Sequence, residues 1–169
     1  MTGYGIIDSD GVQSRHIDSG CIYVKGDELP ERLGDIFKCV SEIIAEWQPT
    51  EMAIESVFVN KNVSSALKLG QARGAAICAA VNKNLQVSEY APKEIKSAVV
   101  GTGNAAKEQV QHMMSMLLNL EKGLQSDQAD ALAIALCHAH QRKMTGIIPP
   151  AARRRGSKRW KNIVVSRKS

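Results

Sequence analysis

Two aspartates stand three residues apart at the start of an apolar stretch of the chain. Asp127 and Asp130 lead into the run 131–137, which is typical of a buried helix. Side chains three positions apart share one face of a helix, so both carboxylates point toward the protein core. Buried carboxylates are costly unless a cation meets them, and a divalent metal ion is the usual solution. The alternative is that the two acids simply favour a helix N-terminus, with Ser126 as its cap.

A third acid lies in a different element. Glu55 is the one charge inside the nearly apolar run at 51–59, which is typical of a buried strand. Binding sites in open α/β sheets form at strand ends. A strand glutamate together with a helical acid pair indicates a two-metal nuclease site, where the metal ions flank an attacking water and a leaving oxygen. Such a site needs a further bridging carboxylate, which we do not find, and the alternative is an edge strand with Glu55 facing solvent.

Composition indicates one soluble globular domain. The chain has 169 residues, of which 44% are hydrophobic and 23% are charged, and this length suffices to bury a full core. No apolar run approaches the length of a membrane-spanning helix, and the first residues show no signal peptide. The four cysteines are scattered without a Cys-x-x-Cys pair, which favours reduced, packed thiols in a cytoplasmic protein.

Positive charge is concentrated at the C-terminal end. Residues 151–169 contain eight lysines and arginines and no acid, whereas the first 150 residues contain 14 bases and 17 acids. We therefore expect a folded unit over residues 1–145 and a basic, flexible tail over residues 146–169. A cationic tail suggests a polyanionic partner such as nucleic acid, and the alternative is a solubilising disordered end.

Apolar spacing and turn residues predict a hairpin followed by alternating helices and strands. The expected strands lie at 5–7, 19–24, 51–59 and 85–91, and the expected helices at 29–47, 63–81, 107–117 and 127–137. The helix at 63–81 is rich in small residues and poor in charge, which indicates burial in the core or against another subunit. Together these elements predict an α/β fold in which helices flank a sheet.

Several segments, in this order and spacing, resemble the RuvC family of Holliday junction resolvases, also called crossover junction endodeoxyribonucleases. They are Thr2-Gly3-Tyr4-Gly5, Ala53-Ile54-Glu55-Ser56-Val57-Phe58, Ser65-Ala66-Leu67-Lys68-Leu69-Gly70-Gln71-Ala72-Arg73-Gly74, Tyr90-Ala91-Pro92, Val99-Val100-Gly101-Thr102-Gly103, Lys107-Glu108-Gln109-Val110 and Asp127-Gln128-Ala129-Asp130-Ala131-Leu132-Ala133. The third segment is long and highly specific. The resemblance covers the chain from Met1 to about His140.

The resemblance implies a ribonuclease-H-like mixed sheet flanked by helices, a homodimer, and paired symmetric nicking of four-way DNA junctions in recombination and repair. The implied cofactor is Mg²⁺, two ions per subunit, and the implied partners are the branch-migration motor and its junction-binding subunit (RuvB and RuvA). The small-residue helix at 63–81 matches the dimer interface.

The resemblance also assigns roles to individual residues. Glu55, Asp127 and Asp130 match three of the family's four metal-binding acids, which makes them the candidate catalytic residues. The implied DNA-binding residues are Phe58, which matches an aromatic that stacks at the opened junction centre, together with Arg73, Lys96 and Lys107.

One departure from the family pattern concerns the N-terminal strand. The family begins with a strand ending in Ile-Asp-Pro-Gly-Ser, about a dozen residues before Thr-Gly-Tyr-Gly, and that strand carries the first catalytic aspartate. In this chain Met1 directly precedes Thr2. We therefore expect the first strand to be missing, with an empty sheet position between the hairpin and the Glu55 strand. The alternatives to a resolvase are a catalytically impaired junction-binding protein and a related ribonuclease-H-like nuclease or transposase with other DNA targets.

Overall fold

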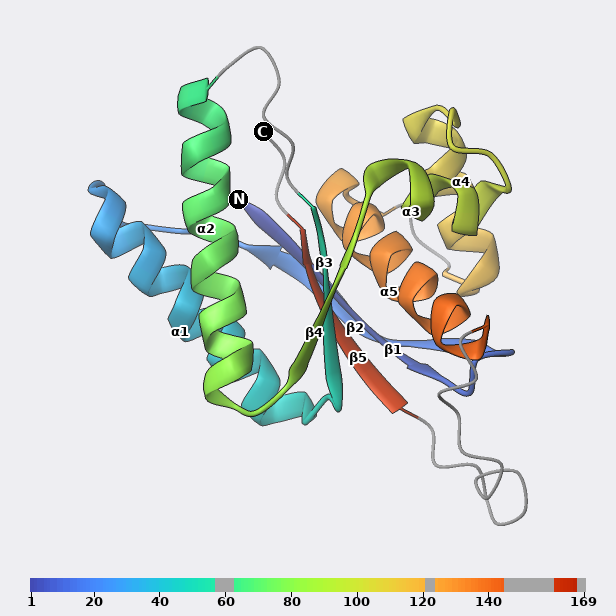
Figure 1. The fold of residues 1–169 in the computed structure, drawn as a ribbon, viewed down its shortest axis with the longest axis horizontal. Coiled ribbons are helices and arrows are strands. Elements are labelled where there is room, and N and C mark those ends of the chain that lie inside the picture. Colours follow the sequence, from blue (N-terminus) through green and yellow to red (C-terminus); the bar gives the residue numbers. More distant parts are fainter. Residues whose placement is uncertain (57–62, 121–123, 145–159, 167–169) are drawn as a thin grey trace.

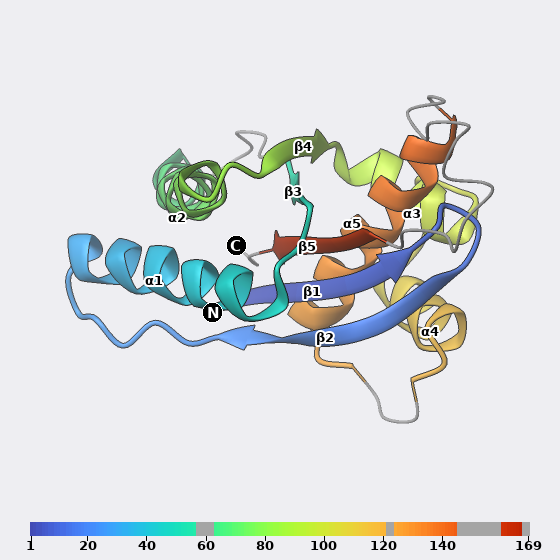
Figure 2. The same ribbon diagram turned by 90° about the horizontal axis from the view of Figure 1, so that it is seen from below.

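The computed structural model describes residues 1–56, 63–120, 124–144 and 160–166. These residues form a mixed five-stranded sheet in the order β2-β1-β5-β3-β4, with α1 and α2 on one side and α3, α4 and α5 on the other (Figures 1 and 2). The elements are β1 (Thr2–Ser9), β2 (Ser14–Ile22), α1 (Leu29–Trp47), β3 (Glu51–Glu55), α2 (Val63–Asn82), β4 (Gln86–Tyr90), α3 (Pro92–Val100), α4 (Lys107–Leu117), α5 (Ser126–Met144) and β5 (Trp160–Ser166). This architecture confirms the predicted α/β sheet flanked by helices.

The inner strands contribute to two separate cores, because successive side chains of a strand point to opposite faces of the sheet. Met52 and Ile163 are fully buried in the core formed with α1 and α2. Ala53 and Val164, one position further along β3 and β5, are fully buried in the core formed with α3, α4 and α5. The same alternation places Glu55, two residues after Ala53, on the side of the sheet that α5 covers.

An inner strand of the sheet comes from the C-terminal part of the chain. β5 runs antiparallel to β1 and parallel to β3, and Val164 pairs with Gly5 on one side and with Ala53 on the other. The ladders on both sides of β5 satisfy backbone groups of β1 and β3 that would otherwise be buried without partners. Fully burying a side chain such as Ile163 or Val164 contributes about 1.5–3 kcal/mol.

This strand corrects two expectations drawn from the sequence. The sequence predicts a flexible tail over residues 146–169 and an empty position between the hairpin and the Glu55 strand, whereas residues 160–166 occupy that position. The run Ile163-Val164-Val165 is β-branched throughout, as suits a buried strand, but the many bases around it obscure this signal. The other residues of the predicted tail, 146–159 and 167–169, lie outside the described residues.

Helix α5 lies directly on β1 because two glycines leave room for it. A Cβ atom on Gly3 would stand 2.0 Å from the backbone carbonyl oxygen of Asp127, and one on Gly5 would stand 2.8 Å from Cδ2 of Leu132. A side chain at either glycine would therefore push the helix away from the sheet. The segment Thr2-Gly3-Tyr4-Gly5 thus sets the distance at which α5 presents its two aspartates.

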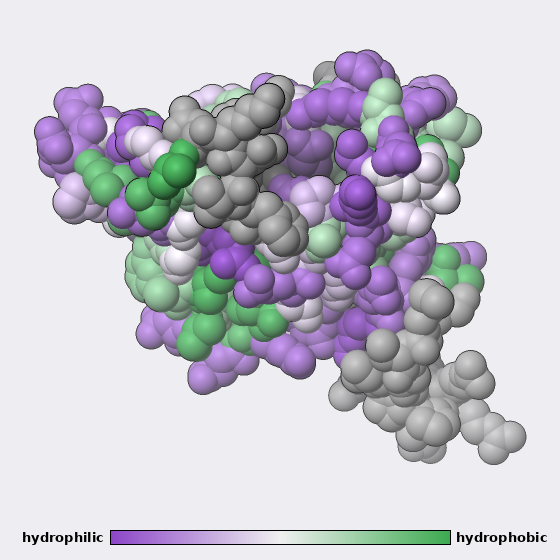
Figure 3. Space-filling view, turned by 45° about the horizontal axis from the view of Figure 1, so that its top comes forward, coloured by the Kyte–Doolittle hydropathy of each residue, from purple (hydrophilic) through white to green (hydrophobic). Residues whose placement is uncertain are grey.

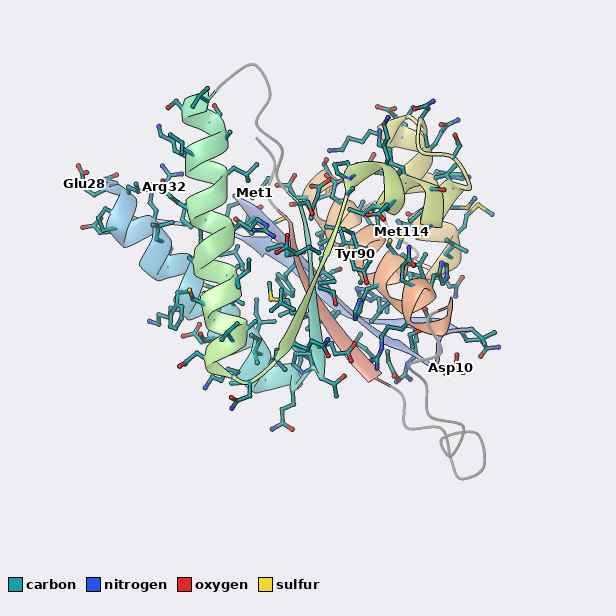
Figure 4. All side chains as sticks on the ribbon, viewed as in Figure 1. Met1, Asp10, Glu28, Arg32, Tyr90 and Met114 are labelled. Atoms are coloured by element: carbon teal, nitrogen blue, oxygen red, sulfur yellow. The ribbon has the colours of Figure 1, made fainter. Side chains whose placement is uncertain are left out.

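The far end of α5 is fixed to the sheet by a buried polar network. The Tyr90 hydroxyl and Nδ1 of His138 share a hydrogen bond of 2.7 Å (Tyr90 is labelled in Figure 4), and Nε2 of His138 lies 2.8 Å from Oε2 of Glu51. Nη1 of Arg142 lies 2.5 Å from the other carboxylate oxygen of Glu51. Burial opposes ionisation of Glu51, but His138 and Arg142 outweigh it and lower the pKa of this carboxyl group. The network ties α5 to β3, the strand that ends at Glu55.

A helix that the sequence analysis does not predict follows β4. α3 begins at Pro92, whose fixed φ suits a first helical turn, and the backbone N–H of Ala91 donates a 2.8 Å hydrogen bond to the Glu94 carboxylate. It ends at Gly101, where φ is 81°, a conformation that glycine adopts readily.

Across the described part of the chain, no helix has the length and apolar character needed to span a membrane.

Candidate active site

Side chains from four elements surround a cavity of about 240 Å³ at the carboxyl end of β3. Glu55 reaches it from the end of β3, Asp130 from α5, Lys96 from α3 and Lys107 from the start of α4. The apolar part of its lining consists of Pro92, Ile95, Val110, Ala133 and Ile134. Two acids and two bases therefore converge at a strand end, where the sequence predicts the site.

Asp130 is paired with a lysine inside this cavity. Nζ of Lys107 donates a hydrogen bond of 3.1 Å to Oδ2 of Asp130, and both side chains are about one-third exposed. Lys107 thus provides Asp130 with a positive partner when neither a metal ion nor DNA is bound. Glu55 and Asp130 are the residues that would hold a divalent cation here, and Lys107 would then be available to a phosphate.

Glu55 carries an electrostatic penalty in the folded protein. Burial raises the pKa of its carboxyl group, the negative charge of Asp130 raises it further, and Lys96 and Lys107 lower it in part. The net effect is an increase above the usual 4.5. A half-buried carboxylate that stands beside a second acid is suited to a divalent cation, which would stabilise its charge.

This penalty predicts how a mutation changes stability with pH. A folded-state pKa above the unfolded value means that ionised Glu55 costs stability at neutral pH, and that the cost disappears as the pH falls below the unfolded value. We therefore expect Glu55→Gln to stabilise the metal-free protein at pH 7 and to lose this advantage below about pH 4.5. Urea unfolding across this pH range measures the difference. Glu42→Gln, at an exposed position of α1, is the matched control, and an equal gain in both variants would contradict the explanation.

Asp127 lies apart from the cavity. Its side chain is 1% exposed, and its two carboxylate oxygens have no hydrogen-bond partner among the described residues. It packs against Gly3, which pairs with Ser166 of β5, whereas Glu55 lies across β5 on β3. Adjacent strands are about 4.8 Å apart, so about 10 Å of sheet separates Gly3 from the β3 position. Within the described ranges, no three His, Cys, Asp or Glu side chains are arranged to hold a metal ion.

The other predicted site residues have different locations. Arg73 does not line the cavity but contacts the backbone of Glu55 and the carboxylate of Glu89, and Phe58 lies outside the described residues. Glu89 carries no local signal in the sequence that marks it as functional. His138 falls on the same side of α5 as Asp130, eight positions later, but its spacing alone does not indicate its role.

Comparisons with known proteins identify the family. Residues 1–138 match the family model described as "Crossover junction endodeoxyribonuclease RuvC". The chain belongs to the RuvC family. The crossover junction endodeoxyribonuclease RuvC of Shewanella oneidensis is 59% identical over 140 residues, which cover 83% of this chain and 81% of the relative. The RuvC of Chromohalobacter salexigens is 51% identical over 164 residues, which cover 96% of this chain and 88% of the relative.

Solved structures of RuvC proteins confirm the fold. The chain matches Thermus thermophilus RuvC with a TM-score of 0.75, and the same organism's RuvC in complex with Holliday junction substrate with a TM-score of 0.79. Each is 34% identical to this chain, and each match covers 85% of this chain. The matches cover 89% of the first T. thermophilus chain and 88% of the second. The ribonuclease-H-like fold and the RuvC resemblance expected from the sequence are therefore confirmed.

Proposed function

We propose that this RuvC family member is a crossover junction endodeoxyribonuclease that resolves Holliday junctions by paired symmetric nicks. The relatives are named for this activity, and a T. thermophilus RuvC is solved with a Holliday junction. The observation in this chain that carries the proposal is the convergence of Glu55 and Asp130 with Lys96 and Lys107 on one cavity. Roles in recombination and repair, association with RuvA and RuvB, and a cytoplasmic location remain predictions from the resemblance.

Mg²⁺ is the cation that suits the residues at this site. The acids offer oxygen ligands, which a hard cation prefers, and burial together with the charge of Asp130 raises the pKa of Glu55 more than Lys96 and Lys107 lower it. When bound, such an ion supplies an activated water and stabilises charge on the phosphate. The two carboxylates of the cavity support one such ion, and a second ion remains a prediction from the resemblance.

The acidic and basic side chains around the cavity have different roles in the proposed cleavage reaction. Glu55 and Asp130 would hold the cation from β3 and α5, which are fixed to each other by the network at the far end of α5. Lys96 and Lys107 would provide positive charge for the DNA backbone, since Lys107 would no longer be the sole partner of Asp130.

A junction-binding protein with impaired catalysis is the second candidate. One observation favours it: among the described residues the cavity holds two carboxylates, and Asp127 lies outside it.

A four-way junction assay tests the proposal against this alternative. We expect the unmodified chain to nick a labelled junction in Mg²⁺, in preference to a duplex of the same sequence, and to bind the junction in Ca²⁺ without cutting. Binding without cutting in Mg²⁺ would support the impaired protein. Equal cutting of junction and duplex would instead indicate a nuclease with other DNA targets.

The outer face of α2 supports the proposed homodimer. Its exposed side carries small and apolar residues at spacings of three and four, which are Val63, Leu67, Gly70, Gly74, Cys78 and Val81. A Cβ atom on Gly70 or Gly74 would meet nothing within 4 Å, so a second helix can approach closely there. Hydrophobic residues gather on the α1–α2 side of the surface (Figure 3). A two-fold dimer would also match a substrate with two symmetric strands to cut.

The dimer proposal predicts the effect of a charge on this face. Gly74→Glu is expected to shift the protein from dimer to monomer, because a dimer would bury two uncompensated carboxylates. Size-exclusion chromatography with light scattering at micromolar concentration measures the mass. Gly34→Glu on α1 is the matched control, since a Cβ there also meets nothing within 4 Å. A dimer that survives Gly74→Glu, or an unmodified chain that is monomeric, would contradict the use of this face.

A further inference from the structure

Arg73 joins three elements behind the cavity. Its Nε donates a hydrogen bond of 3.1 Å to the backbone carbonyl oxygen of Glu55, and its Nη2 lies 2.5 Å from Oε2 of Glu89. The Arg73 side chain is 20% exposed. Because Arg73 belongs to α2, Glu55 to β3 and Glu89 to β4, one guanidinium group connects the helix to the two strands beside it.

The contact with Glu55 restrains the backbone at the end of β3. Glu55 pairs with Tyr90 of β4, and the next N–H, that of Ser56, donates a 2.9 Å hydrogen bond to the Tyr90 carbonyl oxygen. The Arg73 bond fixes the Glu55 carbonyl group immediately before this point. The backbone sets the direction of the Cα–Cβ bond, so these bonds fix the point from which the Glu55 side chain extends toward the cavity.

The same geometry argues against a direct DNA contact by Arg73. The resemblance counts Arg73 among the DNA-binding residues, and a phosphate contact requires an accessible cation. Arg73 is mostly buried, and Glu89 already offers its guanidinium a carboxylate partner. A phosphate would have to displace Glu89 to take its place.

We propose that Arg73 is a positioning residue that directs Glu55 toward Asp130, and that Glu89 holds Arg73 in place. The catalytic consequence of this inference rests on the proposed function. A displacement of about 1 Å in a catalytic group can cost roughly a hundredfold in rate, so loss of the Arg73 contact has a measurable effect.

Three variants test the inference. Arg73→Gln removes the bridge, Glu89→Gln weakens its anchor, and Lys68→Gln makes the same charge change as Arg73→Gln at an exposed position of α2. We expect Arg73→Gln to lower single-turnover cleavage of a four-way junction in Mg²⁺ by roughly 10- to 100-fold. Glu89→Gln should lower it less, and Lys68→Gln should leave it unchanged. Junction binding in Ca²⁺ should be unaltered by Arg73→Gln and by Glu89→Gln.

A DNA-contact role gives the opposite pattern. Arg73→Gln would then weaken junction binding and reduce the slope of log K against log salt by about 0.9. Glu89→Gln would tighten binding, because it removes a negative charge and frees the arginine. Either result, or unchanged cleavage in Arg73→Gln, would overturn the positioning role.

Two further measurements separate this inference from folding defects and from the proposed function. Arg73→Lys keeps the charge but cannot reach both partners in the same way, so full cleavage by this variant would contradict the inference. Amide hydrogen exchange at Ser56 reports on the end of β3 without any cleavage. We expect faster exchange at Ser56 in Arg73→Gln with core amides unchanged, even if the unmodified chain failed to cut. Unchanged exchange at Ser56 would overturn the inference, whereas a failure of cleavage alone would overturn only the proposed function.

Discussion

Replacement of Val164 by aspartate is expected to unfold the protein. Val164 is fully buried in the middle of the sheet, between Gly5 of β1 and Ala53 of β3. The substitution forfeits about 1.5–3 kcal/mol of apolar burial and places an unpaired charge in the core, which costs several kcal/mol more. That total is comparable with the whole stability of a typical domain, about 5–15 kcal/mol. Urea unfolding followed by circular dichroism measures the loss.

The control for this experiment is the same substitution at an exposed valine. Val12 lies in the turn between β1 and β2 and is 70% exposed, so Val12→Asp should change stability by less than about 0.5 kcal/mol. Equal unfolding midpoints for Val164→Asp and Val12→Asp would show that residues 160–166 do not form an inner strand of the folded protein.

Loss of either cavity acid is expected to abolish cleavage. Asp130→Asn and Glu55→Gln each remove a proposed ligand of the cation, and such a cation would supply several kcal/mol of transition-state stabilisation. At about 1.4 kcal/mol per factor of ten, we expect single-turnover cleavage to fall roughly 10²–10⁴-fold. Junction binding in Ca²⁺ should remain near normal, because phosphate contacts by bases dominate affinity.

The Asp127→Asn variant separates the role that the resemblance assigns to Asp127 from the role that its position in the structure indicates. The resemblance predicts the same loss of cleavage as for Asp130→Asn. The structure instead buries Asp127 against Gly3 without a hydrogen-bond partner among the described residues, so its replacement should mainly affect stability. A cleavage loss in Asp127→Asn equal to that in Asp130→Asn would show that Asp127 belongs to the working site.

Local patterns in the sequence were sufficient for much of the fold. The helix predicted at 29–47 matches α1, because its apolar residues recur at helical spacing between two prolines. The apolar run at 51–59 predicts the strand that contains Glu55 but leaves open whether Glu55 faces the core or solvent, and the structure makes it half-buried at the end of β3. Of the two acids that the helical period places on the core-facing side of α5, Asp130 lines the cavity together with Glu55.

Other features depend on contacts between distant segments. The position of β5 depends on pairing with β1, far away in sequence, and no local pattern specifies that pairing. Asp127 and Asp130 share a broad helix face but differ by about 60° around the axis and about 4.5 Å along it. That offset is enough to place one acid over β1 and the other at the cavity. The Arg73–Glu89 pair likewise arises only once α2 packs beside the β3–β4 ladder.

The Glu55–Asp130 cavity is proposed to cut four-way junctions with a divalent cation. The most direct test maps the cleavage products of a junction labelled on each strand in turn, with the unmodified chain and Asp130→Asn side by side in Mg²⁺. We predict nicks at symmetric positions in two opposite strands with the unmodified chain, and none with Asp130→Asn, although both bind the junction in Ca²⁺. Equal nicking by both proteins, or binding without nicks by the unmodified chain, would contradict the claim.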